Sequence, residues 1–117
     1  MTLPVLTRGD IVSTPFPFAD LRGSKVRPAL ILSHGRIGQD VILAAVSSVV
    51  RGATWPTDYL VDVSHPEFRL TGLKVASVVR LHKLASIEAS ILLRRLGRIG
   101  PRMQADIDPL LRAMLSL

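Results

Sequence analysis

Short runs of aliphatic and β-branched residues dominate the sequence, separated by segments that contain glycine, proline and polar residues. The runs at 26–33 and 41–50 are joined by a glycine-containing turn that extends from Gly35 to Asp40. Apolar runs of this kind are typical of buried strands, and the short turn between them predicts an antiparallel pair. No run approaches the roughly 20 apolar residues that a membrane-spanning helix needs, so we expect no membrane partner.

Further strands are predicted on both sides of this pair. Their ranges are 10–14, 59–63, 74–81, a short strand at 83–87 and a strand-like stretch at 94–99, with loops at 19–25 and 51–57 and a helical turn at 89–92. About five to seven short strands with a small terminal helix predict a mainly β fold, either a compact barrel or a sandwich. The 117 residues fit a single domain, 1–117.

Gly100 and Pro101 predict the start of a C-terminal helix, because proline suits the first helical position. Apolar residues then follow at helical spacing: Met103, Ile107, Leu110, Leu111, Met114 and Leu115. Pro109 falls inside this pattern and would cost a straight helix about 3 kcal/mol. We therefore expect a kink or break there, with Asp108 capping a restarted turn.

The charge balance indicates a polyanionic partner. Lysine and arginine total 15 against 9 acidic residues, the net charge is +6 and the sequence pI is about 11.1. Only Lys25, Lys74 and Lys83 are lysines, and the planar fork of arginine binds phosphate oxygens in a bidentate way. Charge of this kind is typical of nucleic-acid-binding domains, but it does not indicate whether the protein catalyses a reaction.

Several classes of site are not expected. The chain has no cysteine, which excludes a disulfide framework and is compatible with a cytoplasmic location, and its first residues lack the features of a secretory signal. Its three histidines have no metal-ligand spacing, so we predict no metal and no cofactor. Nucleophile-elbow, Walker and dinucleotide-binding motifs are missing from the sequence.

The remaining candidate is a cationic site. Arg27 precedes Pro28, which favours an extended backbone at that position. Arg80 and His82 are two residues apart on a predicted strand and should point to the same face. An arginine that stabilises phosphate charge beside an imidazole that exchanges protons is a minimal phosphodiesterase. The alternative for Arg27 is an ordinary surface ion pair with Asp20.

Motifs along nearly the whole chain resemble those of the MazF/PemK-like toxins of type II toxin–antitoxin systems. The blocks that carry the resemblance are 8–12 (RGDIV), 15–18 (PFPF), 23–33 (GSKVRPALILS), 41–48 (VILAAVSS), 71–74 (TGLK), 77–80 (SVVR) and the tail at 84–115. The resemblance implies an SH3-like barrel of the CcdB/MazF type that forms a homodimer and binds a cognate acidic antitoxin. It also implies metal-independent cleavage of single-stranded RNA, in which the ribose 2′-hydroxyl attacks the adjacent phosphorus and leaves a 2′,3′-cyclic phosphate and a 5′-hydroxyl.

Carried over by position, the resemblance places Arg27 at the scissile phosphate and Ser47 where these toxins usually have a threonine. Arg80 and His82 match the family's Arg-x-Asp pattern, with an imidazole in place of the carboxylate. These four are the predicted catalytic residues, and the general base stays open between His82, Asp20 and a water. The predicted RNA-binding residues are Asp20, Lys25, Ser48, Trp55 and Lys74.

Trp55 and Phe18 are candidates for stacking on bases, although Trp55 would equally suit packing over the barrel end. Phe16 and Phe18 better suit core or dimer contacts. Two other functions stay open: a toxin of the same fold that inhibits DNA gyrase by binding, and a non-enzymatic nucleic-acid-binding barrel.

Overall fold

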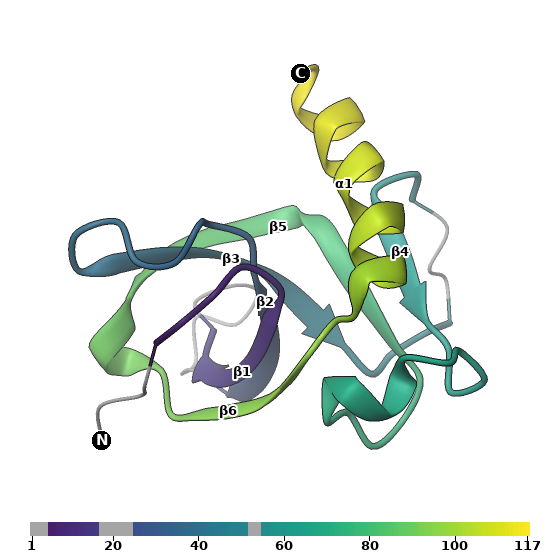
Figure 1. Cartoon of the computed structure of the whole chain (residues 1–117), viewed down its shortest axis with the longest axis horizontal. Helices are drawn as coiled ribbons and strands as arrows, with labels where there is room; N and C mark the ends of the chain where they lie inside the picture. Colours follow the sequence, from purple (N-terminus) through teal and green to yellow (C-terminus); the bar gives the residue numbers. More distant parts are fainter. Residues whose placement is uncertain (1–4, 17–24, 52–54) are drawn as a thin grey trace.

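The computed structural model of the chain describes residues 5–16, 25–51 and 55–117. Six strands form one antiparallel sheet in the order β4-β5-β3-β2-β1-β6, and the sheet curls into a half-barrel with helix α1 on one side (Figure 1). The strands are β1 Asp10–Pro15, β2 Val26–Ile31, β3 Asp40–Ser47, β4 Asp58–Val61, β5 Ser77–Glu88 and β6 Arg94–Arg98. The helices are η1 Phe68–Thr71, η2 Ala89–Ile91 and α1 Pro101–Leu115. The predicted mainly β fold with a C-terminal helix is confirmed.

Strand β5 corrects one prediction. The segments 74–81 and 83–87 were expected as separate strands, but Ser77–Glu88 is a single strand that pairs with both β3 and β4. Ala44 pairs with Leu84 and the next residue, Ala45, pairs with Arg80, so three residues of β5 bulge out between consecutive partners. A bulge bends a strand and increases its twist, and this bend lets β5 continue from one half of the curled sheet into the other (Figure 1).

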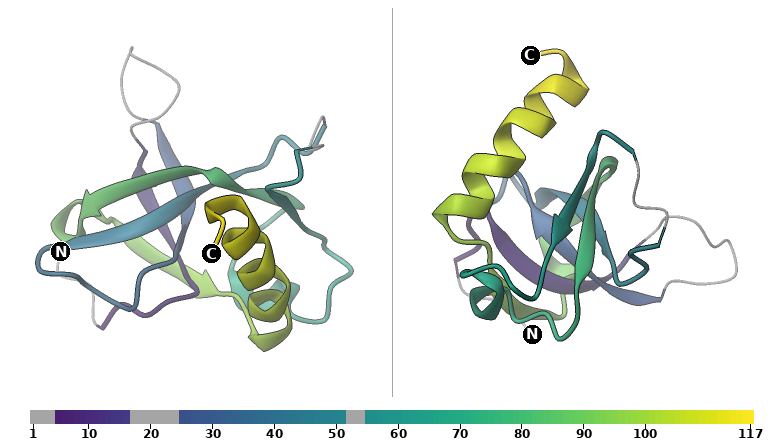
Figure 2. Two further views of the ribbon diagram at one scale, coloured as in Figure 1. Left: turned by 90° about the horizontal axis from the view of Figure 1, so that it is seen from above. Right: turned by 90° about the vertical axis from the view of Figure 1, so that its right-hand side faces the viewer.

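The sheet is buried on both faces, which explains why its strands read as continuous apolar runs. On β2, Leu30 packs into a core that α1 covers with Met103 and Ile107. Its neighbour Ala29 packs into a second core inside the curl, which also contains the predicted core residue Phe16. Figure 2 shows α1 lying outside the curled sheet.

Helix α1 begins at Pro101, as predicted, but the predicted break at Pro109 is wrong. The helix continues without interruption to Leu115. Pro109 donates no hydrogen bond to the carbonyl of Ala105, and both residues are exposed, so water can satisfy that carbonyl. Asp108 does not cap a new turn; its Oδ1 accepts hydrogen bonds from Gln104 Nε2 and Arg8 Nη2. In the described part of the chain, no helix is long and apolar enough to cross a membrane.

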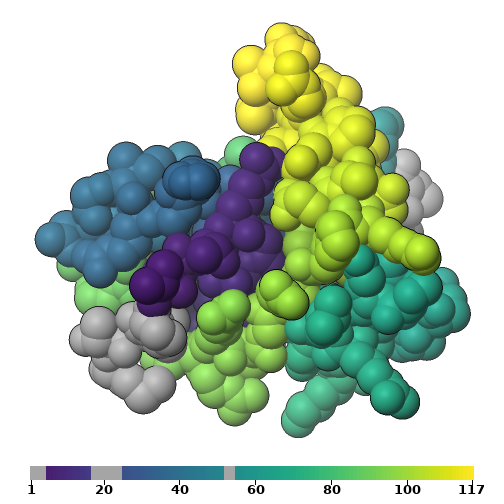
Figure 3. All heavy atoms as spheres, in the orientation of Figure 1, coloured from purple at the N-terminus to yellow at the C-terminus, as the bar shows by residue number. Residues whose placement is uncertain are grey.

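The start of α1 is capped from a distant segment. The carboxylate of Glu67 accepts hydrogen bonds from the backbone N–H groups of Arg102 and Met103, at 3.0 and 2.8 Å. Gly100 leaves the room for this contact, because a Cβ at that position would lie 2.2 Å from Glu67 Cδ. Figure 3 shows the beginning of α1 resting on the segment that carries Glu67. The helix is thereby held against the sheet at one end.

Candidate functional site

A basic pocket of about 500 Å³ opens at the ends of β2 and β3. It is lined by Arg27 from β2, Ser48 directly after β3, Lys74 from the segment before β5 and Arg94 from β6. Its other lining residues are Ser13, Val26, Pro28, Val46, Gly72, Leu73, Val75, Ser77 and Leu96. The fold thus brings together three predicted site residues that lie up to 47 positions apart in the sequence.

The positive charges of this pocket are not neutralised within the described part of the chain. There, the side chains of Arg27, Lys74 and Arg94 form no ion pair. Arg27 and Lys74 are both exposed. The suggested partner of Arg27, Asp20, lies outside the described residues. Uncompensated guanidinium and ammonium groups around serine hydroxyls suit the binding of phosphate oxygens.

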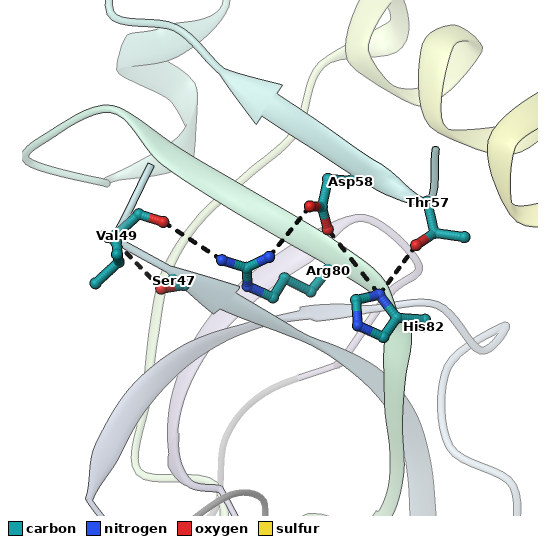
Figure 4. A network of polar contacts seen from close by, with 6 residues as sticks. All are labelled: Ser47, Val49, Thr57, Asp58, Arg80 and His82. Atoms are coloured by element: carbon teal, nitrogen blue, oxygen red, sulfur yellow. Dashed lines mark hydrogen bonds and ion pairs between the residues drawn. The ribbon is translucent and has the colours of Figure 1, made fainter. Parts of the chain in front are cut away.

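A polar network lies where β4 and β5 pair (Figure 4). Arg80 Nη1 donates to Asp58 Oδ2 at 3.1 Å, and Arg80 Nη2 makes a longer contact of 3.5 Å with the carbonyl oxygen of Val49. His82 Nδ1 lies 3.0 Å from Thr57 Oγ1 and 4.0 Å from Asp58 Oδ1. The expectation that Arg80 and His82 share one face is confirmed, because both contact the same carboxylate.

Strand register explains this network. Asp58 is paired with Arg80 across β4 and β5, and Arg80 is paired with Ala45 of β3. Residues directly opposite each other in antiparallel strands point to the same face of the sheet. The side chain of Asp58 is consequently only 3% exposed and that of Arg80 only 16%. Such a buried carboxylate needs a charged or hydrogen-bonding partner, and Arg80 is that partner.

Ser47, at the end of β3, is linked to the network through Val49, whose carbonyl oxygen contacts Arg80. Its hydroxyl accepts a hydrogen bond from the backbone N–H of Val49 at 3.1 Å. Ala29 pairs with Ala45, so counting two residues further along each strand places Arg27 opposite Ser47. By register, Arg27, Ser47 and Arg80 therefore share one face of the sheet, and His82, which lies in the bulge of β5, joins them through its contact with Asp58. Arg27 also lines the pocket, but Pro28 and Val46, which line it too, belong to the opposite face by the same register.

The other predicted RNA-binding residues that the structure describes, Trp55 and Lys25, do not line the pocket. The Trp55 side chain is 63% exposed, with its ring centroid 6.4 Å from that of His82. This exposure contradicts packing over the barrel end, and stacking on bases stays a prediction. Lys25 is exposed next to the start of β2, outside both the pocket and the network. Asp20 and Phe18 lie outside the described residues.

Sequence reasoning missed Asp58, Thr57 and Arg94. Asp58 was placed just before a predicted strand at 59–63, and no local pattern shows which acid faces Arg80, since that depends on how β4 pairs with β5. Across residues 5–16, 25–51 and 55–117, no cluster of three or more histidines and acids is placed to hold a metal. The network itself suits a cation poorly, because its one carboxylate among the described residues is paired with the positive guanidinium of Arg80.

Several solved structures have a similar fold. MazF from Deinococcus radiodurans has a TM-score of 0.74 at 22% identity, with 98% of this chain and 100% of that chain covered. For an endoribonuclease from a mycobacterial species the TM-score is 0.71 at 22% identity, over 100% and 97% of the two chains. A mycobacterial endoribonuclease in complex with its cognate antitoxin gives 0.73 at 21% identity, over 96% of each. At these identities the similarity establishes the fold and leaves function to the site.

Sequence comparison identifies the family. No curated protein matches the chain. A family model of the PemK-like, MazF-like toxins matches residues 7–115, which include the Arg-Pro, Gly-Leu-Lys and valine-strand blocks that form the pocket and the network. The resemblance seen in the motifs is thus confirmed over nearly the whole length. The chain belongs to the PemK-like, MazF-like toxins of type II toxin–antitoxin systems.

Proposed function

We propose that this toxin is a metal-independent endoribonuclease that cleaves single-stranded RNA at short sequences and thereby inhibits translation. The observation that carries the proposal is a basic pocket whose cations have no ion-pair partner among the described residues, in the same domain as the Arg80–Asp58–His82 network. Fixed cations can stabilise the charge of a pentacoordinate phosphorus without a metal. The endoribonucleases among the similar structures support the same conclusion.

In the proposed reaction the ribose 2′-oxygen attacks the adjacent phosphorus. The new O2′–P bond forms as the P–O5′ bond breaks, which leaves a 2′,3′-cyclic phosphate and a 5′-hydroxyl. His82 takes the proton from the 2′-hydroxyl through Nε2, and a solvent water gives a proton to the leaving O5′. Arg27 and Arg80 stabilise the non-bridging oxygens, and Ser47 donates its hydroxyl hydrogen to one of them.

The same surface accounts for the proposed partners. Dependence on the 2′-hydroxyl makes RNA the substrate and lets DNA bind without being cut. Trp55, exposed beside His82, provides a flat surface on which an unpaired base can stack. A basic face also attracts an acidic antitoxin segment that folds on contact and covers the RNA site. We propose a homodimer in the cytoplasm as the working form.

The test is cleavage of a mixed-sequence single-stranded RNA by the purified protein in excess EDTA. Arg27→Ala should lower the cleavage rate by at least about 100-fold. Arg36→Ala is the matched control, because it removes another exposed arginine, whose one side-chain hydrogen bond within the described residues is to Gln39; it should change the rate by less than about two-fold. Products should carry 5′-hydroxyl ends.

Intact RNA after incubation with the wild-type protein would contradict the nuclease proposal. It would favour the gyrase-inhibiting or purely binding alternatives, and a DNA supercoiling assay would then separate these two. Equal cleavage by wild type and Arg27→Ala would keep the nuclease but remove Arg27 from its site.

A further inference from the structure

Only one of the two oxygens of the Asp58 carboxylate accepts a hydrogen bond from the described residues. Oδ2 accepts from Arg80 Nη1 at 3.1 Å, whereas Oδ1 is buried and has no hydrogen-bond partner in the described part of the chain. Buried acceptors are normally satisfied, and one left open inside a candidate site calls for a function. His82 Nδ1 lies 4.0 Å from this Oδ1 (Figure 4).

The surroundings of His82 distinguish its two ring nitrogens. Nδ1 lies 3.0 Å from Thr57 Oγ1 with the Asp58 carboxylate behind it, and Nε2 is turned away from both (Figure 4). The charged groups of the network that face the ring are Asp58 and, through it, Arg80. A negative charge on this side favours a proton on Nδ1, with Thr57 Oγ1 as its acceptor. Nε2 then keeps its lone pair on the exposed side, since the His82 side chain is 37% exposed.

We infer that Asp58 is a positioning residue whose two oxygens serve two different partners. Oδ2 fixes the guanidinium of Arg80, and Oδ1 selects the Nδ1–H tautomer of His82, with Thr57 as the acceptor. The inference rests on the proposed ribonuclease function, because a general base for the 2′-hydroxyl needs a free lone pair on Nε2.

The same arrangement supports the later stage of the reaction. Once Nε2 has taken the proton of the 2′-hydroxyl, the ring carries a positive charge about 4 Å from Asp58. A small rotation brings Nδ1–H from Thr57 Oγ1 to Asp58 Oδ1, which satisfies the open acceptor and stabilises the imidazolium. Arg80 meanwhile uses two of its five N–H donors for Asp58 and Val49, and among the described residues its other donors have no hydrogen-bond partner that would compete with a phosphate.

Asp58→Asn tests this role, because asparagine keeps the size of the side chain and an acceptor for Arg80 but removes the negative charge. With an RNA oligonucleotide that contains one mapped cleavage site, kcat should fall by at least about tenfold and KM should change by less than about two-fold. The matched control is Asp62→Asn, an exposed carboxylate that accepts hydrogen bonds from the backbone and the side chain of Ser64, which the amide oxygen of asparagine can also accept. The control should cleave like the wild type.

A second measurement does not depend on activity. Nitrogen-15 NMR of the histidine side chains should show the His82 proton on Nδ1 in the wild type and a shift toward Nε2 in Asp58→Asn. A folded Asp58→Asn protein that keeps either the wild-type kcat or the wild-type tautomer overturns the inference. If the wild-type protein cleaves no RNA, the proposed function fails, and the NMR comparison by itself decides whether Asp58 orients His82.

Discussion

Two of the buried carboxylates in this molecule lie in different polar regions and have different surroundings. Glu67, only 7% exposed, sits beneath the first turn of α1, and its oxygens accept the backbone N–H groups of Arg102 and Met103. Asp58, in the β4–β5 network, has one oxygen paired with Arg80 and one buried oxygen without a partner among the described residues. Each is surrounded by chain segments that are distant in sequence.

The two carboxylates differ in how many of their oxygens accept hydrogen bonds: both oxygens of Glu67 do, but only one oxygen of Asp58 does among the described residues. Glu67 neutralises the partial positive charge at a helix start and satisfies donors that would otherwise be unpaired, so its effect is on stability. Asp58 retains an open acceptor beside a titratable ring, so its effect should be on chemistry. Substitutions on the Glu67 side should therefore lower stability and leave cleavage unchanged below the melting transition.

The largest effect is expected from Gly100→Ala. The new Cβ would lie 2.2 Å from Glu67 Cδ and Oε2, although the backbone itself, with φ of −86°, accepts alanine. The Glu67 side chain must move and release the helix start, which should cost about 3 kcal/mol and lower the melting midpoint by roughly 10 °C. Thermal unfolding followed by circular dichroism measures this.

Gly38→Ala is the control for that variant. No atom lies within 4 Å of its Cβ position, but its φ of +62° is left-handed, so alanine should cost only about 1 kcal/mol. If the two variants lower the melting midpoint equally, the contact between Gly100 and Glu67 contributes nothing to stability beyond the cost of replacing a glycine.

A smaller effect is expected from Glu67→Gln, which should lower the midpoint at pH 7 by about 5 °C. Burial raises the pKa of Glu67, but the backbone hydrogen bonds from Arg102 and Met103 outweigh it and hold the pKa below its usual value of 4.5. The stabilisation is therefore complete above pH 4.5 and is lost as the pH falls through the lowered value.

Melting curves of wild type and Glu67→Gln should consequently differ most above pH 4.5 and converge in more acidic solution. The pKa of Asp62 is also lowered, by hydrogen bonds from Ser64, but Asp62 titrates in both proteins and cancels in the difference. A difference that stays constant down to pH 3 would contradict a charged Glu67 cap.

The smallest effect is expected at a third carboxylate, Asp108 on α1. It forms an ion pair of 2.7 Å with Arg8, and both side chains are about 40% exposed. Asp108→Asn should change the free energy of unfolding by less than about 0.5 kcal/mol, because solvent screens such pairs. Chemical denaturation measures it; a loss above 1 kcal/mol would show that this exposed pair anchors the start of the chain to α1.

Most elements of the fold could be predicted from the sequence. The two apolar runs of the central pair and the Gly100–Pro101 helix start are local signals, and the structure confirms them. The unbroken β5 could not be predicted, because a bulge is defined only against the partner strand. The continuity of α1 through Pro109 could not be predicted either. It depends on the exposure of the Ala105 carbonyl to water, and the spacing of apolar residues does not show that exposure.

The site was predicted in parts. Arg27, Ser48 and Lys74 were chosen for their residue type and their family blocks, and the structure places them on one pocket. Their roles, like those of Ser47, Arg80 and His82, stay predictions. Arg94 was missed because it is one of twelve arginines and no local pattern distinguishes it. It reaches the pocket because β6 pairs with β1, which places Arg94 opposite Ser13, another residue of the pocket lining.

The sequence by itself determined the strand-forming runs, the helix start, the basic charge and the family, because these follow from residue type and local order. The tertiary structure alone decided which acids are buried and what faces them. Strand pairing brings Asp58 to Arg80 and His82, and the packing of α1 on the segment before η1 brings Glu67 to Met103. The energy of a carboxylate depends on its solvation and neighbours, and both are set only when the chain closes on itself.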